Sequence, residues 1–393
     1  MINTKYKRVY DEFINNYENI HINPWHEISK EELNNIYNKL INELDINDDY
    51  SFNYFINYII KRLSGLSDTH TFYWSRDFIP YTFKIIDDKV LVNYPDSLKG
   101  YYLESINGID IKNIIKEIDN IITYGTNGKK VFEIEKSLFN RMIMFGLPIF
   151  SNNNELIYEL VDNNGYRKNI IINKEEKYDN LFDYDTYLYG NNTEYKIIDN
   201  CLIYNHSSVQ NKYKELIEQK IEELKHINLD NINTIIIDLR GNIGGNSSLN
   251  NYLIDFLKEH LDKKIICLTD YRIFSGGRYA LRDLINLGAI TIGDEIGTPI
   301  NCYGNNTWCN IDNYYFGISE HYYNPMYLKD DSGKYLSICA CNKEEYKNNI
   351  SEEILKPIIF KPDIYVNQTI EDYLNNIDTV LKYAIEYSKF KER

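Results

Sequence analysis

The sequence predicts an α/β protein, α+β overall, whose core is an α/β sheet in the C-terminal half. Three observations support this prediction. From residue 196 onward, short apolar stretches alternate with stretches long enough for helices, a pattern typical of parallel strands covered by helices. The stretch 233–240 (NTIIIDLR) is largely apolar, as strands buried on both faces are. Two glycine-rich turns, at 241–245 and 275–277, each separate a predicted strand from a predicted helix.

Length and charge limit the classes of function. At about 150 residues per domain, the 393 residues are enough for two or three domains. The formal net charge of −15 repels phosphate, so we expect no nucleic-acid partner, no membrane partner and no strongly acidic substrate. The first 13 residues lack the apolar run of a secretory signal, and no stretch reaches roughly 18 apolar residues. We therefore expect a cytoplasmic protein with reduced cysteines.

Residues 1–75 are predicted to form an N-terminal helical module that ends in a loop bearing a histidine. Apolar residues between 33 and 44 recur at the spacing of an amphipathic helix, with Ser29 as its N-cap and Glu32 in the capping-box position. A second apolar run ends at Gly65, a residue type common at helix C-termini.

Residues 76–195 are predicted to form a small α+β module and a linker. Short apolar blocks between 79 and 107 indicate strands, with turns at 87–88 and 107–108. The other predicted elements are helices at 109–122 and 131–145, a hairpin at 155–173 and a polar linker at 174–195.

Residues 196–393 are predicted to form the α/β core. The predicted strands are 201–207, 233–240, 263–269 and 289–295, and the predicted helices are 213–227, 247–260 and 276–287. We expect β-hairpins at 301–345 and one amphipathic helix at 369–387.

The turn after the strand at 233–240 places Gly244 and Gly245 at the start of a helix. Backbone N–H groups at a helix start are free to bind an anion. The segment fits a phosphate cradle, an oxyanion hole built from these N–H groups, or a plain tight turn. It lacks the Lys-Ser/Thr of a P-loop and the G-x-G-x-x-G spacing. On this segment alone, the alternatives stay open.

The second turn places Ser275 between a strand and a helix, followed by Gly276 and Gly277. A serine at such an elbow is exposed beside backbone N–H groups, as a nucleophile requires. Serine is also a preferred helix N-cap, which is the structural alternative.

A serine nucleophile needs a base, commonly histidine or lysine. Among the seven histidines, His70 is flanked by Asp68 and Thr69, which can orient an imidazole. His206, at a predicted strand end, is the next candidate. For each histidine, the alternative is a polar residue with a purely structural role.

Six segments of the chain match a known set of motifs in order. They are LSDTHT at 66–71, SING at 105–108, DLRGNIGG at 238–245, FSGGR at 274–278, GDEIGTPINCYG at 293–304 and PDIYVNQTIEDYLNNID at 362–378. Together they resemble the C-terminal processing (tail-specific) serine peptidases, particularly the branch like the tricorn protease core. One such segment is a weak signal, whereas six in order are specific.

The resemblance implies a serine peptidase that cleaves peptides or protein C-terminal tails with a crotonase/ClpP-like α/β core. The helical module would cap this core, and the α+β module would be PDZ-like or gate the substrate. Ser275 would attack the scissile carbonyl, and N–H groups of Gly276 and of Gly244 or Gly245 would hold the oxyanion. The implied partner is peptide or unfolded protein, with no metal or organic cofactor and with the oligomeric state open.

Two departures from the family pattern bear on the site. Many members have a lysine base where this chain has Pro299, whereas the tricorn-like branch uses a histidine after a serine, which match His70 and Thr69. The resemblance thus implies His70 as general base, Thr69 as a hydroxyl relay and Glu353 as the acid that completes the set. The other departure is Arg278, where many members have glutamate.

The leading hypothesis is therefore a serine peptidase that uses Ser275 and His70. The alternative is a non-catalytic peptide- or ligand-binding relative that retains the fold, favoured by Arg278, the paired glycines and the missing lysine. A phosphate-binding α/β protein is a third interpretation, disfavoured because no lysine follows the turn at 241–245.

Overall fold

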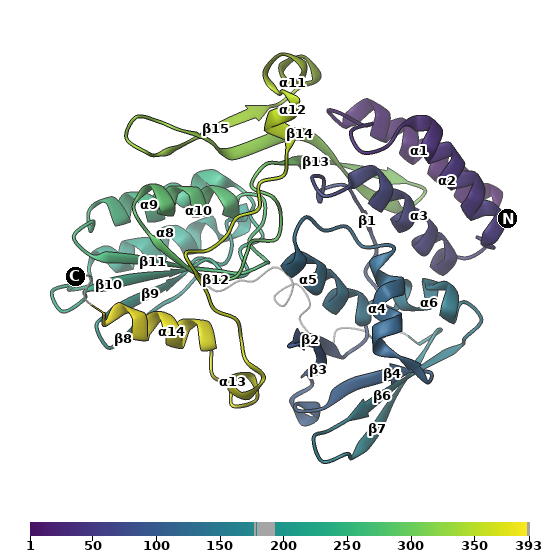
Figure 1. Cartoon of the computed structure of the whole chain (residues 1–393), viewed down its shortest axis with the longest axis horizontal. Coiled ribbons are helices and arrows are strands. Elements are labelled where there is room, and N and C mark those ends of the chain that lie inside the picture. Colours follow the sequence, from purple (N-terminus) through teal and green to yellow (C-terminus); the bar gives the residue numbers. More distant parts are fainter. Residues whose placement is uncertain (177, 179–192, 391–393) are drawn as a thin grey trace.

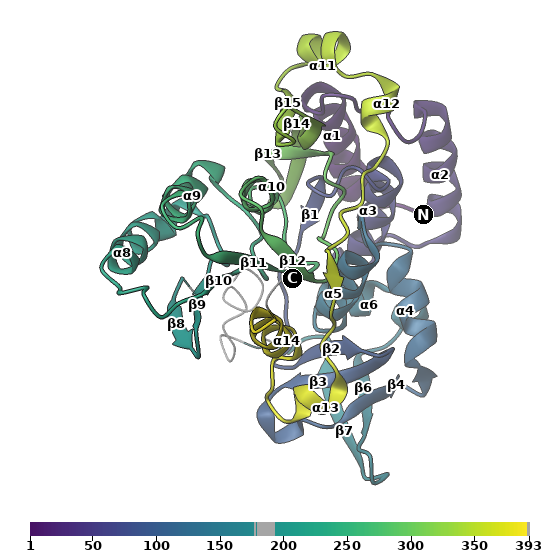
Figure 2. The same cartoon turned by 60° about the vertical axis from the view of Figure 1, so that its left-hand side comes forward.

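The computed structural model describes residues 1–176, 178 and 193–390, and the described strands form three sheets (Figures 1 and 2). The core sheet has the strand order β16-β12-β11-β10-β9-β8. Its neighbouring strands are parallel except for β8, which pairs antiparallel with β9. The prediction of an α/β core in a mixed α/β protein is therefore confirmed.

The core elements follow the predicted order. The strands are β8 (Tyr195–Ile198), β9 (Cys201–Asn205), β10 (Thr234–Asp238), β11 (Lys264–Thr269), β12 (Ile290–Gly293) and β16 (Ile364–Tyr365). The helices are α8 (Lys214–Lys225), α9 (Asn250–Lys258), α10 (Gly277–Asn286), α13 (Ile370–Leu374) and α14 (Thr379–Ser388). The short 3-10 helices η3 (Asn211–Tyr213) and η4 (Ser247–Leu249) lead into α8 and α9.

The core sheet is buried on both faces. Ile235 and Ile237 of β10 belong to the apolar cluster beneath α8, α9 and α10. Ile236 points to the opposite face, where it packs with Val380 and Ala384 of α14. Figure 1 shows α8, α9 and α10 on one side of the sheet and α14 on the other. Because side chains alternate along a strand, burial of both faces explains why β10 is apolar at each central position.

The middle of the chain forms an antiparallel sheet in the order β2-β3-β4-β6-β7, with β5 beside β4. The predicted turns at 87–88 and 107–108 are confirmed, since all four residues have positive φ, as tight hairpins require. The elements are β2 (Thr82–Ile86), β3 (Lys89–Tyr94), η1 (Asp96–Leu98), β4 (Tyr102–Ile106), β5 (Ile109–Asp110), α4 (Ile111–Asp119), α5 (Asn127–Leu138), α6 (Arg141–Gly146), η2 (Pro148–Phe150), β6 (Glu155–Val161) and β7 (Arg167–Asn173).

The N-terminal helices are α1 (Thr4–Ile20), α2 (Lys30–Glu43) and α3 (Asp49–Ser64). The capping box of Ser29 and Glu32 at the start of α2 is confirmed, and α3 ends at Gly65 as predicted. These helices share one apolar cluster with Phe316 and Ile318 of β14, so they pack directly on the third sheet.

The third sheet joins the two ends of the chain. It contains β1 (Phe72–Trp74), β13 (Cys302–Ile311), β14 (Tyr314–Lys329) and β15 (Tyr335–Ala340), and α11 (Lys343–Asn349) and α12 (Glu352–Leu355) follow it. Strand β1 pairs antiparallel with β14. The loop that carries His70, between α3 and β1, is therefore held against strands from the C-terminal half.

Two predicted helices are each divided in the structure. The stretch 131–145 contains the end of α5 and most of α6, because the side chain of Asn140 caps a new helix by accepting a hydrogen bond from the Met142 N–H. The tail 369–387 contains α13 and nearly all of α14, because Asn376 has φ of 57° and Asp378 caps α14. Most of the predicted linker at 174–195 lies outside the described residues.

Some predictions about the architecture stay untested. The crotonase/ClpP-like core, the PDZ-like character of the middle sheet and the domain boundaries remain predictions. Among the described helices, none has the length and apolar character needed to cross a bilayer.

Candidate active site

Ser275 lies in the turn between β11 and α10, where its backbone is constrained. Its φ of 47° is in the left-handed region, which non-glycine residues seldom adopt. The turn is fixed on both sides, since Gly277 N–H donates to the Phe274 carbonyl and Arg278 N–H to the Ser275 carbonyl. A serine held half-buried in a strained strand-to-helix turn is the local geometry of a nucleophile elbow.

The two glycine-rich turns contact each other. A Cβ atom at Gly244 would lie 2.4 Å from the Gly276 nitrogen and 2.8 Å from the Ser275 Cβ. The Phe274 N–H also donates to the Asn242 carbonyl, at 2.9 Å. The turns that follow the neighbouring parallel strands β10 and β11 thus form one site, as their shared carboxyl edge requires.

The backbone N–H groups beside Ser275 differ in their availability. The Gly244 N–H already donates to Oδ1 of Asn242, at 2.9 Å. In the described part of the chain, the N–H groups of Gly245 and Gly276 have no acceptor. Two of the three predicted oxyanion donors therefore have an N–H group without an acceptor, and Gly244 instead provides the close approach of the two turns.

His70 lies against the Ser275 turn. Its ring stacks on the neighbouring Phe274 ring with centroids 4.1 Å apart, and Gly304 of β13 leaves room for its other edge. Neither ring nitrogen has a hydrogen-bond partner among the described residues, so His70 and Ser275 are not hydrogen-bonded to each other. Burial, helped by the charge of Arg278, lowers the pKa of His70 to about 3, so the imidazole is neutral.

Asp68 holds the loop that carries His70. Its Oδ1 accepts hydrogen bonds from the backbone N–H groups of His70 and Thr71 and from the Ser319 hydroxyl. Its Oδ2 lies 3.2 Å from Nε2 of His21, and both side chains are fully buried. Although burial alone would raise the pKa of Asp68, His21 and Ser319 hold it well below its usual range.

Arg278 is fully buried directly after the Ser275 turn. Its guanidinium donates hydrogen bonds to the carbonyl of Ser275 and to the carbonyl of Ile300. The residue that departs from the family pattern thus ties the Ser275 turn to the segment that leads into β13.

One cavity of about 700 Å³ contains most of the predicted site. Ser275, His70, Thr69, Gly244 and Gly245 all line it, whereas the predicted oxyanion donor Gly276 is buried and does not. The Thr69 hydroxyl is buried without a hydrogen-bond partner among the described residues.

Two other sequence candidates lie outside this cavity. Glu353 is exposed on α12 and does not line it. His206 is buried beneath the turn at 241–245, where Nε2 contacts Oδ1 of Asn250 at 3.0 Å. Its carbonyl accepts a hydrogen bond from the Asn242 side chain, so His206 supports the turn from below.

Sequence reasoning missed His21 as the partner of Asp68, because the residues around His21 carry no recognisable motif, and it treated Asp68 only as a neighbour of His70. The motif at 66–71 contains Asp68, but its partners His21 and Ser319 come from distant parts of the chain.

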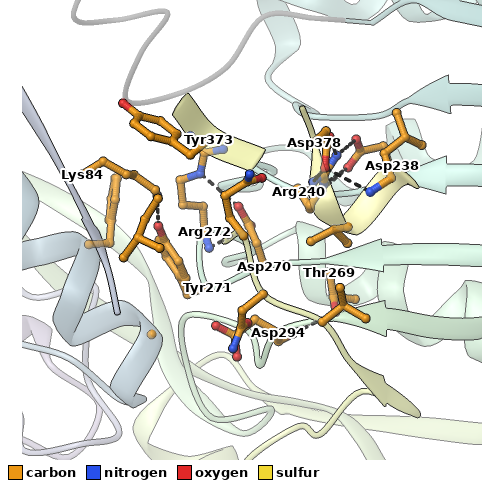
Figure 3. Close-up of a pocket in the computed structure, with 18 of the residues that line it drawn as sticks. Lys84, Asp238, Arg240, Thr269, Asp270, Tyr271, Arg272, Asp294, Tyr373 and Asp378 are labelled. Atoms are coloured by element: carbon orange, nitrogen blue, oxygen red, sulfur yellow. Dashed lines mark hydrogen bonds and ion pairs between the residues drawn. The ribbon is translucent and has the colours of Figure 1, made fainter. Parts of the chain in front are cut away.

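A second cavity, of about 800 Å³, lies where the core sheet meets the middle module and the C-terminal tail (Figure 3). Arg240 forms ion pairs with Asp238 and Asp378 on one side of it. Lys84 and Tyr271 are hydrogen-bonded to each other on the other side (Figure 3). Since its charged groups largely pair with one another, we interpret this cavity as a junction that connects the parts of the chain.

Comparison with known proteins gives a likeness in structure only. No protein-family model and no curated protein matches the sequence. The structure is similar to the crystal structure of mature CPAF, with a TM-score of 0.62 and 10% identity over 98% of this chain and 96% of that chain. The chain has the fold of CPAF.

Two other solved structures are less similar. The photosystem II D1 C-terminal processing protease has a TM-score of 0.42 and 9% identity over 93% of this chain and 94% of that chain. The tricorn protease has a TM-score of 0.42 and 14% identity over 98% of this chain and 36% of that chain. The likeness to mature CPAF supports the resemblance seen in the sequence as a likeness of fold.

Proposed function

We propose that the protein is a serine peptidase that cleaves peptides or the C-terminal tails of proteins, with Ser275 as nucleophile and His70 as general base. The observation that supports this most is the joining of the two glycine-rich turns. Their contact places the strained Ser275 next to Gly245 and Gly276, whose N–H groups have no acceptor among the described residues, and Ser275 and Gly245 line the same cavity as His70.

The proposed reaction has two steps. The Ser275 hydroxyl oxygen attacks the scissile carbonyl while its proton passes to the His70 imidazole, and the N–H groups of Gly245 and Gly276 stabilise the oxyanion. The imidazolium then protonates the amine that leaves, which gives an acyl-enzyme. Water, deprotonated by His70, attacks the ester, and Ser275 recovers its proton as the acid product leaves.

Two changes must accompany substrate binding. The His70 ring has to turn toward Ser275, since the two are not hydrogen-bonded in the substrate-free structure. Its pKa has to rise from about 3, because a base of that strength accepts a proton poorly. Negative charge that develops on the substrate favours the imidazolium and raises this pKa. We propose that Asp68, and not Glu353, orients the His70 loop and that Thr69 supports the ring.

The decisive experiment is labelling with a fluorophosphonate probe, which reacts with activated serines. We expect the wild type and a Ser151→Ala control, at an exposed turn, to be labelled and Ser275→Ala to be unlabelled. His70→Gln should fold normally but label at least about a hundredfold more slowly, the size of a general-base contribution. Equal labelling of the wild type and Ser275→Ala would refute the assignment of the nucleophile.

The alternative is a non-catalytic peptide-binding protein with the same fold. The missing hydrogen bond between His70 and Ser275 favours it. Tight peptide binding by the wild type, without labelling and without cleavage on prolonged incubation, would identify this alternative.

A further inference from the structure

We propose that the cavity at Ser275 selects peptide segments in which a large apolar side chain lies next to acidic side chains. This inference rests on the proposed function for the identity of the site, and it adds the class of substrate. Two features of the cavity wall support it, one apolar and one electrostatic.

The apolar feature is a group of three rings on β1 and β13. Trp308 meets Phe72 edge-on at 5.2 Å between centroids and Trp74 edge-on at 5.5 Å. Although these contacts join the three rings, 54% of Trp308 is still exposed. The group therefore presents apolar surface that a ligand can bury. All three line the cavity that contains Ser275, so a large apolar side chain of a bound peptide can pack on them.

The electrostatic feature is an excess of cations in the same wall. With Arg76 left aside, the charged side chains among the described lining residues are the cations Lys129, Lys136 and Lys212 and the single carboxylate Glu133. Glu133 pairs with both Lys129 and Lys136, at 3.0 Å and 2.5 Å. One carboxylate cannot neutralise two lysines, so α5 keeps a net positive charge toward the cavity.

The cations lie beside the aromatic group. The Arg76 guanidinium lies over the Trp74 ring, 4.0 Å from its centroid, and the Lys129 amine lies over the Phe274 ring beside Ser275. A peptide that packs an apolar side chain on the rings of this cavity therefore brings its neighbouring residues close to the positive charge of the α5 lysines. Acidic side chains complement this charge, and basic side chains are repelled.

The charge of the cavity is opposite to that of the whole chain. The net charge of −15 led to the expectation that acidic substrates are disfavoured. At physiological salt, however, charges beyond about 8 Å are screened, so the nearby cations decide the preference of the site. A free C-terminal carboxylate would offer the same chemistry as an acidic side chain, and the test must separate the two sources.

The test measures binding of C-terminally amidated, fluorescent peptides to Ser275→Ala, which keeps the cavity but removes the nucleophile. The peptides share one sequence except for a central Glu-Phe-Glu, Gln-Phe-Gln, Glu-Ala-Glu or Lys-Phe-Lys. We expect Glu-Phe-Glu to bind about tenfold more tightly than Gln-Phe-Gln or Glu-Ala-Glu and Lys-Phe-Lys to bind most weakly. The advantage over Gln-Phe-Gln should shrink as salt is added.

Matched variants locate the preference. Lys136→Gln should reduce the advantage of Glu over Gln, and Trp308→Ala should reduce that of Phe over Ala, each by at least about threefold. Lys116→Gln, on the exposed side of α4 and outside the cavity, should change neither. Circular dichroism of each variant confirms that it is folded.

Three outcomes overturn the proposal. One is equal binding of Glu-Phe-Glu and Gln-Phe-Gln, and another is no binding of any peptide at millimolar concentration. The third is tighter binding only when the C-terminal amide is replaced by a free carboxylate, which would identify the chain terminus as the group recognised. Since binding is measured without the nucleophile, a failure of fluorophosphonate labelling would refute the peptidase and leave this preference intact.

Discussion

His21 and Asp68 form a fully buried pair directly behind the loop that carries His70, with Nε2 of His21 3.2 Å from Oδ2 of Asp68. His21 also stacks on His26, with centroids 5.1 Å apart. The other carboxylate oxygen of Asp68 holds the His70 and Thr71 backbone. The pair therefore links the residue that caps the C-terminus of α1 to the position of the proposed base.

The first prediction concerns this pair. Asp68→Asn keeps an oxygen that can accept from the loop N–H groups but removes the charge that faces His21. We therefore expect the loop to keep its conformation but to hold His70 less rigidly. We expect kcat to fall at least about tenfold with KM little changed, and stability to fall by about 1–3 kcal/mol, as when a buried polar group loses its partner. Steady-state kinetics and urea unfolding measure the two effects.

A double-mutant cycle is the control for this prediction. If the two residues act as a pair, His21→Gln combined with Asp68→Asn should cost less than the sum of the single substitutions. Additive losses in both kcat and stability would contradict a pair that positions His70.

The second prediction concerns the contact between the two glycine-rich turns. In Gly244→Ala, the new Cβ would lie 2.4 Å from the Gly276 nitrogen, so the turns must separate. We expect labelling at Ser275 to slow by about a hundredfold or more, since one free oxyanion donor contributes about that much. Gly165→Ala is the control, because Gly165 also has positive φ but open space around it. Equal effects of the two substitutions would show that backbone strain alone matters.

The sequence predicted this contact only in part. Each turn alone was compatible with a purely structural role. Only the resemblance of the ordered motifs to a peptidase family implied that the two turns belong to one site. The parallel order of β10 and β11 explains why they meet, and the alternating pattern of strands and helices already predicts such an order. The sequence does not reveal which N–H groups are free, because that depends on the Asn242 side chain that occupies the Gly244 N–H.

The surroundings of His70 were harder to predict than the turns. Asp68 lies two residues away, but its role depends on His21 at the end of α1 and Ser319 on β14. Such contacts arise when distant segments pack, and no local spacing encodes them. Glu353 shows the opposite error. Its position in the sequence suggested a role in the site, but the residue lies on an exposed helix and does not line the cavity.

The third prediction concerns stability at low pH. Burial lowers the pKa of His26 to about 4 and that of His70 to about 3, below the ordinary 6.5. Between about pH 6.5 and 4 the unfolded chain therefore binds more protons than the folded one, so stability falls as pH falls, by up to about 1.4 kcal/mol per pH unit for each histidine. Asp68, whose pKa is depressed, loses its contribution only below about pH 4.

Urea unfolding at pH 8, 6 and 5 tests this prediction. His26→Gln should reduce the slope between pH 6 and 5, whereas substitution of the exposed His226 by glutamine should leave it unchanged. A wild-type stability that is the same at pH 8 and pH 5 would contradict neutral buried histidines.

The fourth prediction concerns Arg278, whose guanidinium holds the Ser275 and Ile300 carbonyls and whose charge lowers the pKa of His70. Arg278→Met leaves two carbonyls without their donors, so we expect a loss of about 1–3 kcal/mol in stability and slower labelling of Ser275. It also removes a positive charge near His70, so the pH below which labelling slows should move higher, toward the ordinary pKa of histidine.

Two variants are the controls. Arg278→Lys keeps the charge and should keep this acid limb of the labelling rate, and Arg282→Met on the same helix should change neither property. An acid limb at the same pH in Arg278→Met and the wild type would show that Arg278 acts only through its hydrogen bonds.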